Sequence, residues 1–213
     1  MNASGEFLIT ASPRTSFGLP ICDLGWNAAL GLAEGLISLH GNRTTLAFLD
    51  ARTTFRQAVD PAYRAQLSGR LLLPGGSRAF GLLMNGMQPK TGPARFSARG
   101  FVPALLTFLE KPCRIGIAGE DCLRVGSLRD HFARHSPWHD VVAIAPGQEA
   151  PEVFDLVIVD APTLAEERRI ERRLASIRTA LVVMARADLS DFVEKRPHAV
   201  SKTGAQAAGL SFA

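Results

Sequence analysis

Short, continuously apolar runs alternate along the chain with longer segments in which apolar residues recur every three to four positions. The first pattern is typical of buried strands and the second of amphipathic helices. The clearest runs predict strands at 44–49, 113–118 and 154–159, and weaker ones at 17–21, 71–73, 141–145 and 181–184. The helical spacing predicts helices at 25–40, 53–67 with a break at Asp60-Pro61, 77–87, 101–110, 123–134 and 163–178.

This alternation predicts an α/β fold, with a mainly parallel, Rossmann-like sheet and helices on both faces. The three clearest strands should be interior strands, since they are apolar throughout. Residues 1–16 are expected to be a flexible N-terminus, 17–190 the α/β domain and 191–213 a loose tail. Ligands bind beyond the carboxyl ends of strands in such sheets. We therefore expect the ligand cleft in the loops after Leu49, Leu73, Ala118 and Val159.

Several well-known sites are excluded by their motifs. No G-x-G-x-x-G follows a strand, so a dinucleotide site is not supported. The glycines from Gly76 to Gly81 lack the Lys and Ser/Thr of a P-loop, and no G-x-S-x-G elbow of an α/β-hydrolase is present. The three cysteines, an odd number without C-x-x-C, suggest neither disulfides nor a zinc site but reduced, buried thiols.

Two polar clusters, one of histidines and one of arginines, each have both a structural and a functional interpretation. His131, His135 and His139 lie four apart and could bind metal on one helix, but Pro137 should end that helix first, so a solvated helix end is favoured. Four arginines of the last predicted helix form either a solvated face or a docking patch for lipid headgroups or a pyrophosphate; they are Arg168, Arg169, Arg172 and Arg173. That helix starts with a T-x-x-E capping box at Thr163 and Glu166.

The stretch Gly119-Glu120-Asp121 lies between a strand and a helix. A helix start can bind phosphate, but two acids would repel it. The acids therefore either stabilise the first turn or contact sugar hydroxyls.

The composition and charge of the chain exclude some classes of protein but do not identify a binding partner. The net charge of +4 is small and spread along the chain, so no nucleic-acid partner is expected. No apolar run of about 18 residues could span a membrane, and no secretory signal is visible. A cytoplasmic protein is the expectation, and its oligomeric state stays open.

The order of several motifs resembles one family. FGLPICDLGWNAAL, TLAFLDARTTFRQAVDPAYRAQL, LLLPGGSRAFGLLM, GPARFSARGFVPALL, CRIGIAGEDCLRVGSLRDHFARHSPWHDVV and FDLVIVDAPTLAEERRI fall in the order of that family's strands, helices and loops. Over about Phe17 to Asp188, the chain is similar to the WecG/TagA/CpsF (also WecB/TagA/CpsF) glycosyltransferases.

The resemblance implies sugar transfer in surface polysaccharide biosynthesis. Members of that family pass a sugar from a UDP donor to a polyprenyl-pyrophosphate-linked acceptor at the inner membrane face, without a metal. The resemblance implies the same partners here, a UDP-sugar and a lipid-linked acceptor, with peripheral membrane contact and no cofactor. The implied site residues are Asp50 and Arg95 as catalytic groups and Gly75, Gly76, Gly119, Asp121, Asp160, Pro162 and Glu166 around the substrate.

The chain also departs from the family pattern at its chemical positions. Gly75-Gly76 replaces the Asp-Gly loop that supplies the family's general base, and an inverting transfer needs such a base. Asp50 stands where the family has Asn, and the tail from Pro197 does not resemble the family's basic C-terminal segment. Two hypotheses follow: a divergent glycosyltransferase with Asp50 as base and Arg95 opposite phosphate charge, or a non-catalytic binding or assembly partner in the same pathway.

Overall fold

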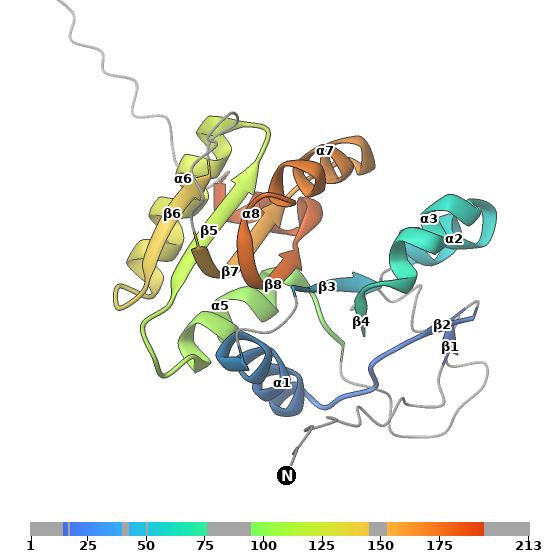
Figure 1. Cartoon of the computed structure of the whole chain (residues 1–213), viewed down its shortest axis with the longest axis horizontal. Coiled ribbons are helices and arrows are strands. Elements are labelled where there is room, and N and C mark those ends of the chain that lie inside the picture. Colours follow the sequence, from blue (N-terminus) through green and yellow to red (C-terminus); the bar gives the residue numbers. More distant parts are fainter. Residues whose placement is uncertain are drawn as a thin grey trace, which may run out of the picture.

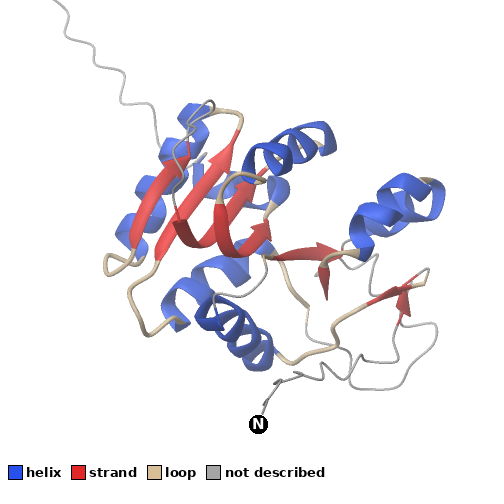
Figure 2. Cartoon of the chain, viewed as in Figure 1, coloured by secondary structure: helices blue, strands red, loops and turns tan. Residues whose placement is uncertain are grey.

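A six-stranded parallel sheet forms the centre of the computed structural model, which describes residues 15–16, 18–39, 43–49, 51–75, 95–144 and 153–193 (Figures 1 and 2). The strand order is β4-β3-β8-β7-β5-β6. The strands are β3 (Thr44–Leu49), β4 (Leu71–Pro74), β5 (Arg114–Gly119), β6 (Asp140–Ile144), β7 (Val153–Asp160) and β8 (Arg178–Met184). The predicted α/β fold is confirmed, and the three clearest predicted strands, now β3, β5 and β7, all lie inside the sheet.

Helices cover both faces of this sheet. One face packs against α1 (Trp26–Leu39), α5 (Ala98–Phe108) and α6 (Cys122–His135). The other packs against α3 (Pro61–Ser68) and α7 (Leu164–Leu174). A hydrophobic core lies on each face of the sheet, and alternate residues of a strand point into one or the other. Leu46 and Phe48 of β3 belong to the core with α1, α5 and α6, and Ala47 belongs to the core with α3 and α7. The continuously apolar strands are thus explained by burial on both sides.

The helix starts follow from local sequence chemistry. Short polar side chains accept hydrogen bonds from backbone N–H groups of the first turn, which have no partner within the helix. These N-cap residues are Asp60 for α3, Ser97 for α5, Asp121 for α6 and Thr163 for α7. The predicted break at Asp60-Pro61 separates α2 (Ala51–Val59) from α3, because proline fits the first helical turn but not a helix interior.

The structure corrects several local predictions. Instead of one strand at 17–21, β1 (Thr15–Ser16) and β2 (Leu19–Pro20) pair antiparallel around Gly18, whose φ of 82° suits glycine. The last predicted helix ends at Leu174, and the strand predicted at 181–184 already starts at Arg178. The thiols are not all buried, since Cys122 is exposed.

Some predictions fall outside the described residues. The helix predicted at 77–87 and the tail from Pro197 belong to these parts of the chain. Within the described ranges, no helix combines the length and apolar character needed to cross a membrane.

Gly119 has no room for a side chain, whereas Gly126, seven residues later on α6, has open space around it. A Cβ on Gly119 would lie 2.6 Å from Val125 Cγ2 and 3.2 Å from the Asp160 carbonyl oxygen. We expect Gly119→Ala to lower the free energy of unfolding by about 1–3 kcal/mol through overpacking. Gly126→Ala, in open space on α6, should raise it by about 0.5–1 kcal/mol. Urea unfolding of both variants measures this, and a neutral Gly119→Ala would contradict the packing argument.

Candidate functional site

A cavity of about 650 Å³ lies at the carboxyl ends of β3, β4, β7 and β8. This volume is within the range of small-molecule sites, about 300–1,000 Å³. The strands or the segments after them supply its wall, including Thr53 after β3, Gly75 after β4, Pro162 after β7 and Arg186 after β8. Three of the four loops predicted to form the cleft therefore do so. The loop after Ala118 does not line this cavity, and the loop after Met184 does.

The chain topology explains why a hollow forms there. After β3 the chain continues into α2 and α3, and α3 covers one face of the sheet. After the adjacent strand β8 it continues toward the opposite face, where Leu189 and Phe192 join the core of α1, α5 and α6. Two neighbouring strands whose continuations leave in opposite directions create a crevice at their ends.

One wall of the cavity is charged and centres on Glu167. The side chain of Glu167 on α7 is only 2% exposed, and Arg70 Nη1 lies 2.5 Å from its Oε1. Arg186 Nε lies 3.4 Å from its Oε2. A buried carboxylate is strongly unfavourable unless it is paired, and here two guanidinium groups pair it.

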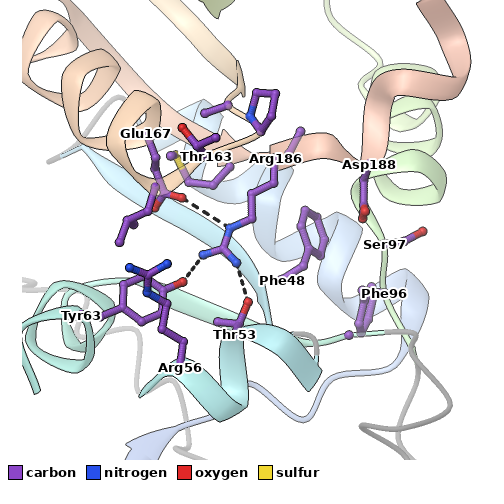
Figure 3. A pocket seen from close by; sticks show the side chains of 16 residues that line it. Phe48, Thr53, Arg56, Tyr63, Phe96, Ser97, Thr163, Glu167, Arg186 and Asp188 are labelled. Carbon is purple, nitrogen blue, oxygen red and sulfur yellow. Dashed lines mark hydrogen bonds and ion pairs between the residues drawn. The ribbon is translucent and has the colours of Figure 1, made fainter. Parts of the chain in front are cut away.

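Arg186 also joins the α2–α3 segment to the sheet. Its guanidinium donates hydrogen bonds to Thr53 Oγ1 on α2 and to the Tyr63 hydroxyl on α3 (Figure 3). Its backbone φ of 53° is in the left-handed region, which costs a non-glycine residue about 1–3 kcal/mol. Such a backbone conformation persists only where surrounding contacts hold it, and it marks Arg186 as a residue fixed at this place.

The second wall is aromatic. Phe48 and Phe96 line the cavity, and Trp26 stacks on Phe96 with ring centroids 5.3 Å apart. Ser97 and Asp188 add polar groups beside Phe96 (Figure 3). Asp188 Oδ2 accepts a hydrogen bond of 3.3 Å from the Ala98 N–H at the start of α5. The cavity therefore offers an aromatic surface on one side and ionised groups on the other.

Arg56 contributes a guanidinium that water can reach. Its side chain is 52% exposed and lines the cavity. Its Cζ lies 5.5 Å from the centroid of the Tyr63 ring, which Arg186 approaches to 5.9 Å. Arg56 also lies 3.8 Å from Asp60 one helical turn away, a solvent-exposed pair that contributes little to stability.

The predicted site residues divide into two groups. Gly75 and Pro162 line the cavity, and exposed Arg95 directly precedes the lining residue Phe96, which pairs with Gly75 in a short parallel bridge. Asp50 and Gly76 lie outside the described residues.

Gly119 and Asp160 form the second group, at the ends of β5 and β7, where they are register partners. Asp160 is bound by Arg124 through both carboxylate oxygens, one at 2.9 Å. Burial raises the pKa of Asp160, Arg124 opposes that rise, and the charges of Glu166 and Asp121 add to it. These four predicted residues are therefore neighbours, but none of them lines the cavity. We expected Asp50, Arg95, Gly119 and Asp160 to approach one pocket; Arg95, Gly119 and Asp160 do not line this cavity, and Asp50 lies outside the described residues.

The acids after β5 have structural partners. Asp121 caps α6 by accepting hydrogen bonds from the N–H groups of Leu123 and Arg124 at 2.9 and 3.1 Å. Glu120 lies 3.4 Å from Arg169 and 3.6 Å from Arg173, and Arg173 donates to the Gly119 carbonyl at 3.0 Å. The start of α6 is thus occupied by its own carboxylate, and half of the arginine patch of α7 is paired.

The three histidines of this series do not all come together in the structure. The α6 helix ends at His135, before Pro137 as predicted. His139 is buried beyond that end, where Nδ1 accepts from the Cys113 N–H at 3.1 Å and Nε2 lies 2.8 Å from the Leu106 carbonyl oxygen. Among the described residues no three His, Cys, Asp or Glu side chains are grouped to hold a metal ion.

The sequence interpretation missed the residues that dominate the charged wall. Arg186 and Asp188 follow a predicted strand, so the strand-end rule could have indicated them. Glu167 and Arg70 gave no such signal, because a charged residue in an Arg- and Glu-rich helix normally predicts a solvated surface. Only the three-dimensional meeting of α3, α7 and the β8 loop reveals their burial.

Replacing Glu167 should be far more damaging than replacing its neighbour Glu166. Glu167→Ala would leave Arg70 and Arg186 without their shared carboxylate, and breaking a buried pair costs about 3–5 kcal/mol. Glu166→Ala removes a part-exposed first-turn acid of the same helix, worth less than about 1 kcal/mol. Urea unfolding of the two variants tests this. Equal losses would show that the buried pairing does not hold the cavity together.

Asp160→Asn should change how stability depends on pH. Because the pKa of Asp160 is raised in the native state, the native state holds this proton more tightly than the unfolded state does. Its contribution to the free energy of unfolding is therefore largest below the ordinary Asp pKa of about 3.9 and declines as pH rises through the native pKa. Asn does not titrate. The stability difference between the unmodified protein and Asp160→Asn should shrink with rising pH in urea unfolding, and a growing difference would show that Arg124 outweighs burial.

No protein-family model matches the chain, and no curated protein matches it either. The chemistry of the cavity and the motif resemblance therefore carry the functional inference.

Proposed function

We propose that the protein binds a nucleotide-linked sugar in the strand-end cavity and transfers that sugar, as the WecG/TagA/CpsF glycosyltransferases do, to a polyprenyl-pyrophosphate-linked acceptor. The observation that carries the proposal is the two-sided cavity, with Phe48 and Phe96 on one wall and ionised groups on the other. A UDP-sugar has the matching parts: flat or ring-shaped groups that pack on aromatic side chains, and a diphosphate that needs cationic partners.

Arg56 is the cavity's best candidate for the diphosphate. Its guanidinium is half exposed within the cavity, so a phosphate could reach it without breaking a buried pair. Arg186 Cζ also lies 5.9 Å from the centroid of the Tyr63 ring, and Arg186 adds positive charge while it pairs with Glu167. In this proposal guanidinium groups meet the diphosphate charge, as expected for a donor that is bound without a metal.

Transfer needs a group that accepts the proton of the acceptor hydroxyl. Gly75 lines the cavity where the resemblance places the family's base, and glycine has no side chain for that role. Glu167 is neutralised by Arg70 and Arg186. Asp188 is an exposed carboxylate in the lining, and Asp50 remains the candidate that the sequence indicates.

A second candidate function is binding without transfer, as an assembly or regulatory partner in the same pathway. The observation that favours it is again Gly75, because the proton acceptor implied by the resemblance is absent from a cavity that is otherwise formed. Both candidates require the nucleotide-linked sugar to bind, so binding tests the proposal and turnover separates its two forms.

UDP and UDP-sugars should raise the unfolding temperature and give a measurable dissociation constant, whereas uridine, which lacks phosphate, should bind much more weakly. Arg56→Ala should weaken UDP binding by about 10–100-fold, the size of a lost charge-assisted hydrogen bond. Arg129→Ala is the matched control, because Arg129 is an exposed arginine on α6 paired with the adjacent Asp130. Thermal unfolding measures the temperature shift, and calorimetric titration measures the dissociation constants of UDP, the UDP-sugars and uridine and those of the two variants.

Turnover is then measured as UDP release with several UDP-sugars and a lipid-pyrophosphate acceptor analogue. Release that depends on acceptor supports the transferase. Binding without release supports the non-catalytic form. If neither UDP nor any UDP-sugar binds, or if Arg129→Ala weakens binding as much as Arg56→Ala, the cavity is not the nucleotide site and the proposal fails.

A further inference from the structure

The corner between α2 and α3 places the exposed guanidinium of Arg56 between an aromatic ring and a carboxylate. Its Cζ lies 5.5 Å from the centroid of the Tyr63 ring on α3, and its Nε lies 3.8 Å from Asp60 Oδ2. Arg56 and Tyr63 line the cavity, and Asp60 does not. The availability of this guanidinium to a ligand therefore depends on how the ring and the carboxylate share it.

Hydrogen bonds fix the shape of this corner. The Asp60 N–H donates to the Arg56 carbonyl oxygen at 2.9 Å, and the Tyr63 N–H donates to Asp60 Oδ1 at 3.0 Å. Arg64 closes the end of α2, since its Nε donates to the Gln57 carbonyl oxygen at 3.1 Å. These contacts set where the backbones of α2 and α3 meet, and so they bring the Tyr63 ring against Arg56.

The Tyr63 ring is held firmly, whereas Arg56 is not. Tyr63 is 2% exposed, and its hydroxyl accepts a hydrogen bond from Arg186, which is paired with the buried Glu167 (Figure 3). The side chain of Arg56 is 52% exposed, and holding such a long side chain in one place is entropically unfavourable. An aromatic ring attracts a cation placed over it. The fixed ring therefore favours the conformers of Arg56 that lie at the cavity.

We propose that Tyr63 is a positioning residue for nucleotide binding, whose ring holds the Arg56 guanidinium where a phosphate binds it. Asp60 acts in the opposite direction, because its carboxylate competes with the phosphate for the same guanidinium. The inference rests on the proposed function, in which Arg56 meets the diphosphate, and it names two residues that set how much of Arg56 is available. The affinity for the nucleotide thereby depends on a side chain, that of Asp60, which lies outside the lining of the cavity.

The charge of Asp60 is separable from its structural role. The start of α3 uses Asp60 Oδ1 as the acceptor of its N-cap hydrogen bond, and Asn caps a helix about as well as Asp does. The pair with Arg56 uses Oδ2 and is solvent-exposed, with side-chain exposures of 52% and 32%, so it contributes little to stability. Replacing Asp60 by Asn therefore removes the competing charge and leaves the corner intact.

The first test is calorimetric titration of the full chain with UDP after Asp60→Asn. This variant should bind UDP about 2–4-fold more tightly, the size of an exposed ion pair. The gain should disappear when Arg56→Ala is added, and it should shrink with added salt. Asp130→Asn is the matched control, because Asp130 is an exposed carboxylate paired with an arginine on α6, and it should leave the UDP affinity unchanged.

The second test is a double-mutant cycle between Tyr63 and Arg56. Tyr63→Leu should weaken UDP binding about 3–10-fold, because the ring is lost, and should have no further effect in the Arg56→Ala background. The conservative variant Tyr63→Phe keeps the ring and should retain the affinity to within about twofold. Tyr63→Leu also leaves a buried space that lowers stability, so circular dichroism must show that it is folded at the titration temperature. If it is not, Asp60→Asn decides.

Three results would overturn the positioning role and leave the proposed function standing, since UDP still binds in each of them. Asp60→Asn could fail to tighten UDP binding. Tyr63→Phe could weaken binding as much as Tyr63→Leu does, which would assign the effect to the hydroxyl. The loss caused by Tyr63→Leu could persist in full in the Arg56→Ala background, which would make it independent of Arg56. If UDP does not bind the unmodified protein at all, the positioning role and the proposed function fail together.

Discussion

The buried carboxylate of Glu167 sets the arrangement of the cavity, because it cannot be left unpaired. Removing a carboxylate from water is unfavourable by several kcal/mol unless good partners replace the water. Those partners, Arg70 and Arg186, come from the end of the α3 segment and from the loop after β8. Once both reach Glu167, Arg186 in turn binds Thr53 and Tyr63. One carboxylate on α7 thereby fixes the positions of three other segments around the hollow.

The same fold has two crevices at its strand ends, and only one is hollow among the described residues. The chain leaves β5 and β7 toward opposite faces, as it does β3 and β8. At β5 and β7, however, Val125 packs on Gly119 and Arg124 occupies Asp160. Protein side chains therefore fill the place where many α/β proteins hold a ligand. Among the described residues the hollow lies at the β3–β8 crevice, where Arg186 contacts Thr53, Tyr63 and Glu167, and our proposal places the ligand there.

The fold could be predicted from the sequence because burial on both faces produces an unmistakable apolar run, as in Phe154–Val159. The site could be predicted only where it follows a strand directly, as Gly75 and Pro162 do. Glu167 was not predictable, since E-E-R-R on a capped helix has the same appearance whether solvated or buried. The prediction for Asp160 failed for a related reason. Its position at the end of a strand is typical of a ligand-binding residue, but its carboxylate is bound by Arg124 of α6. Pairings between charges distant in sequence have no periodic signal.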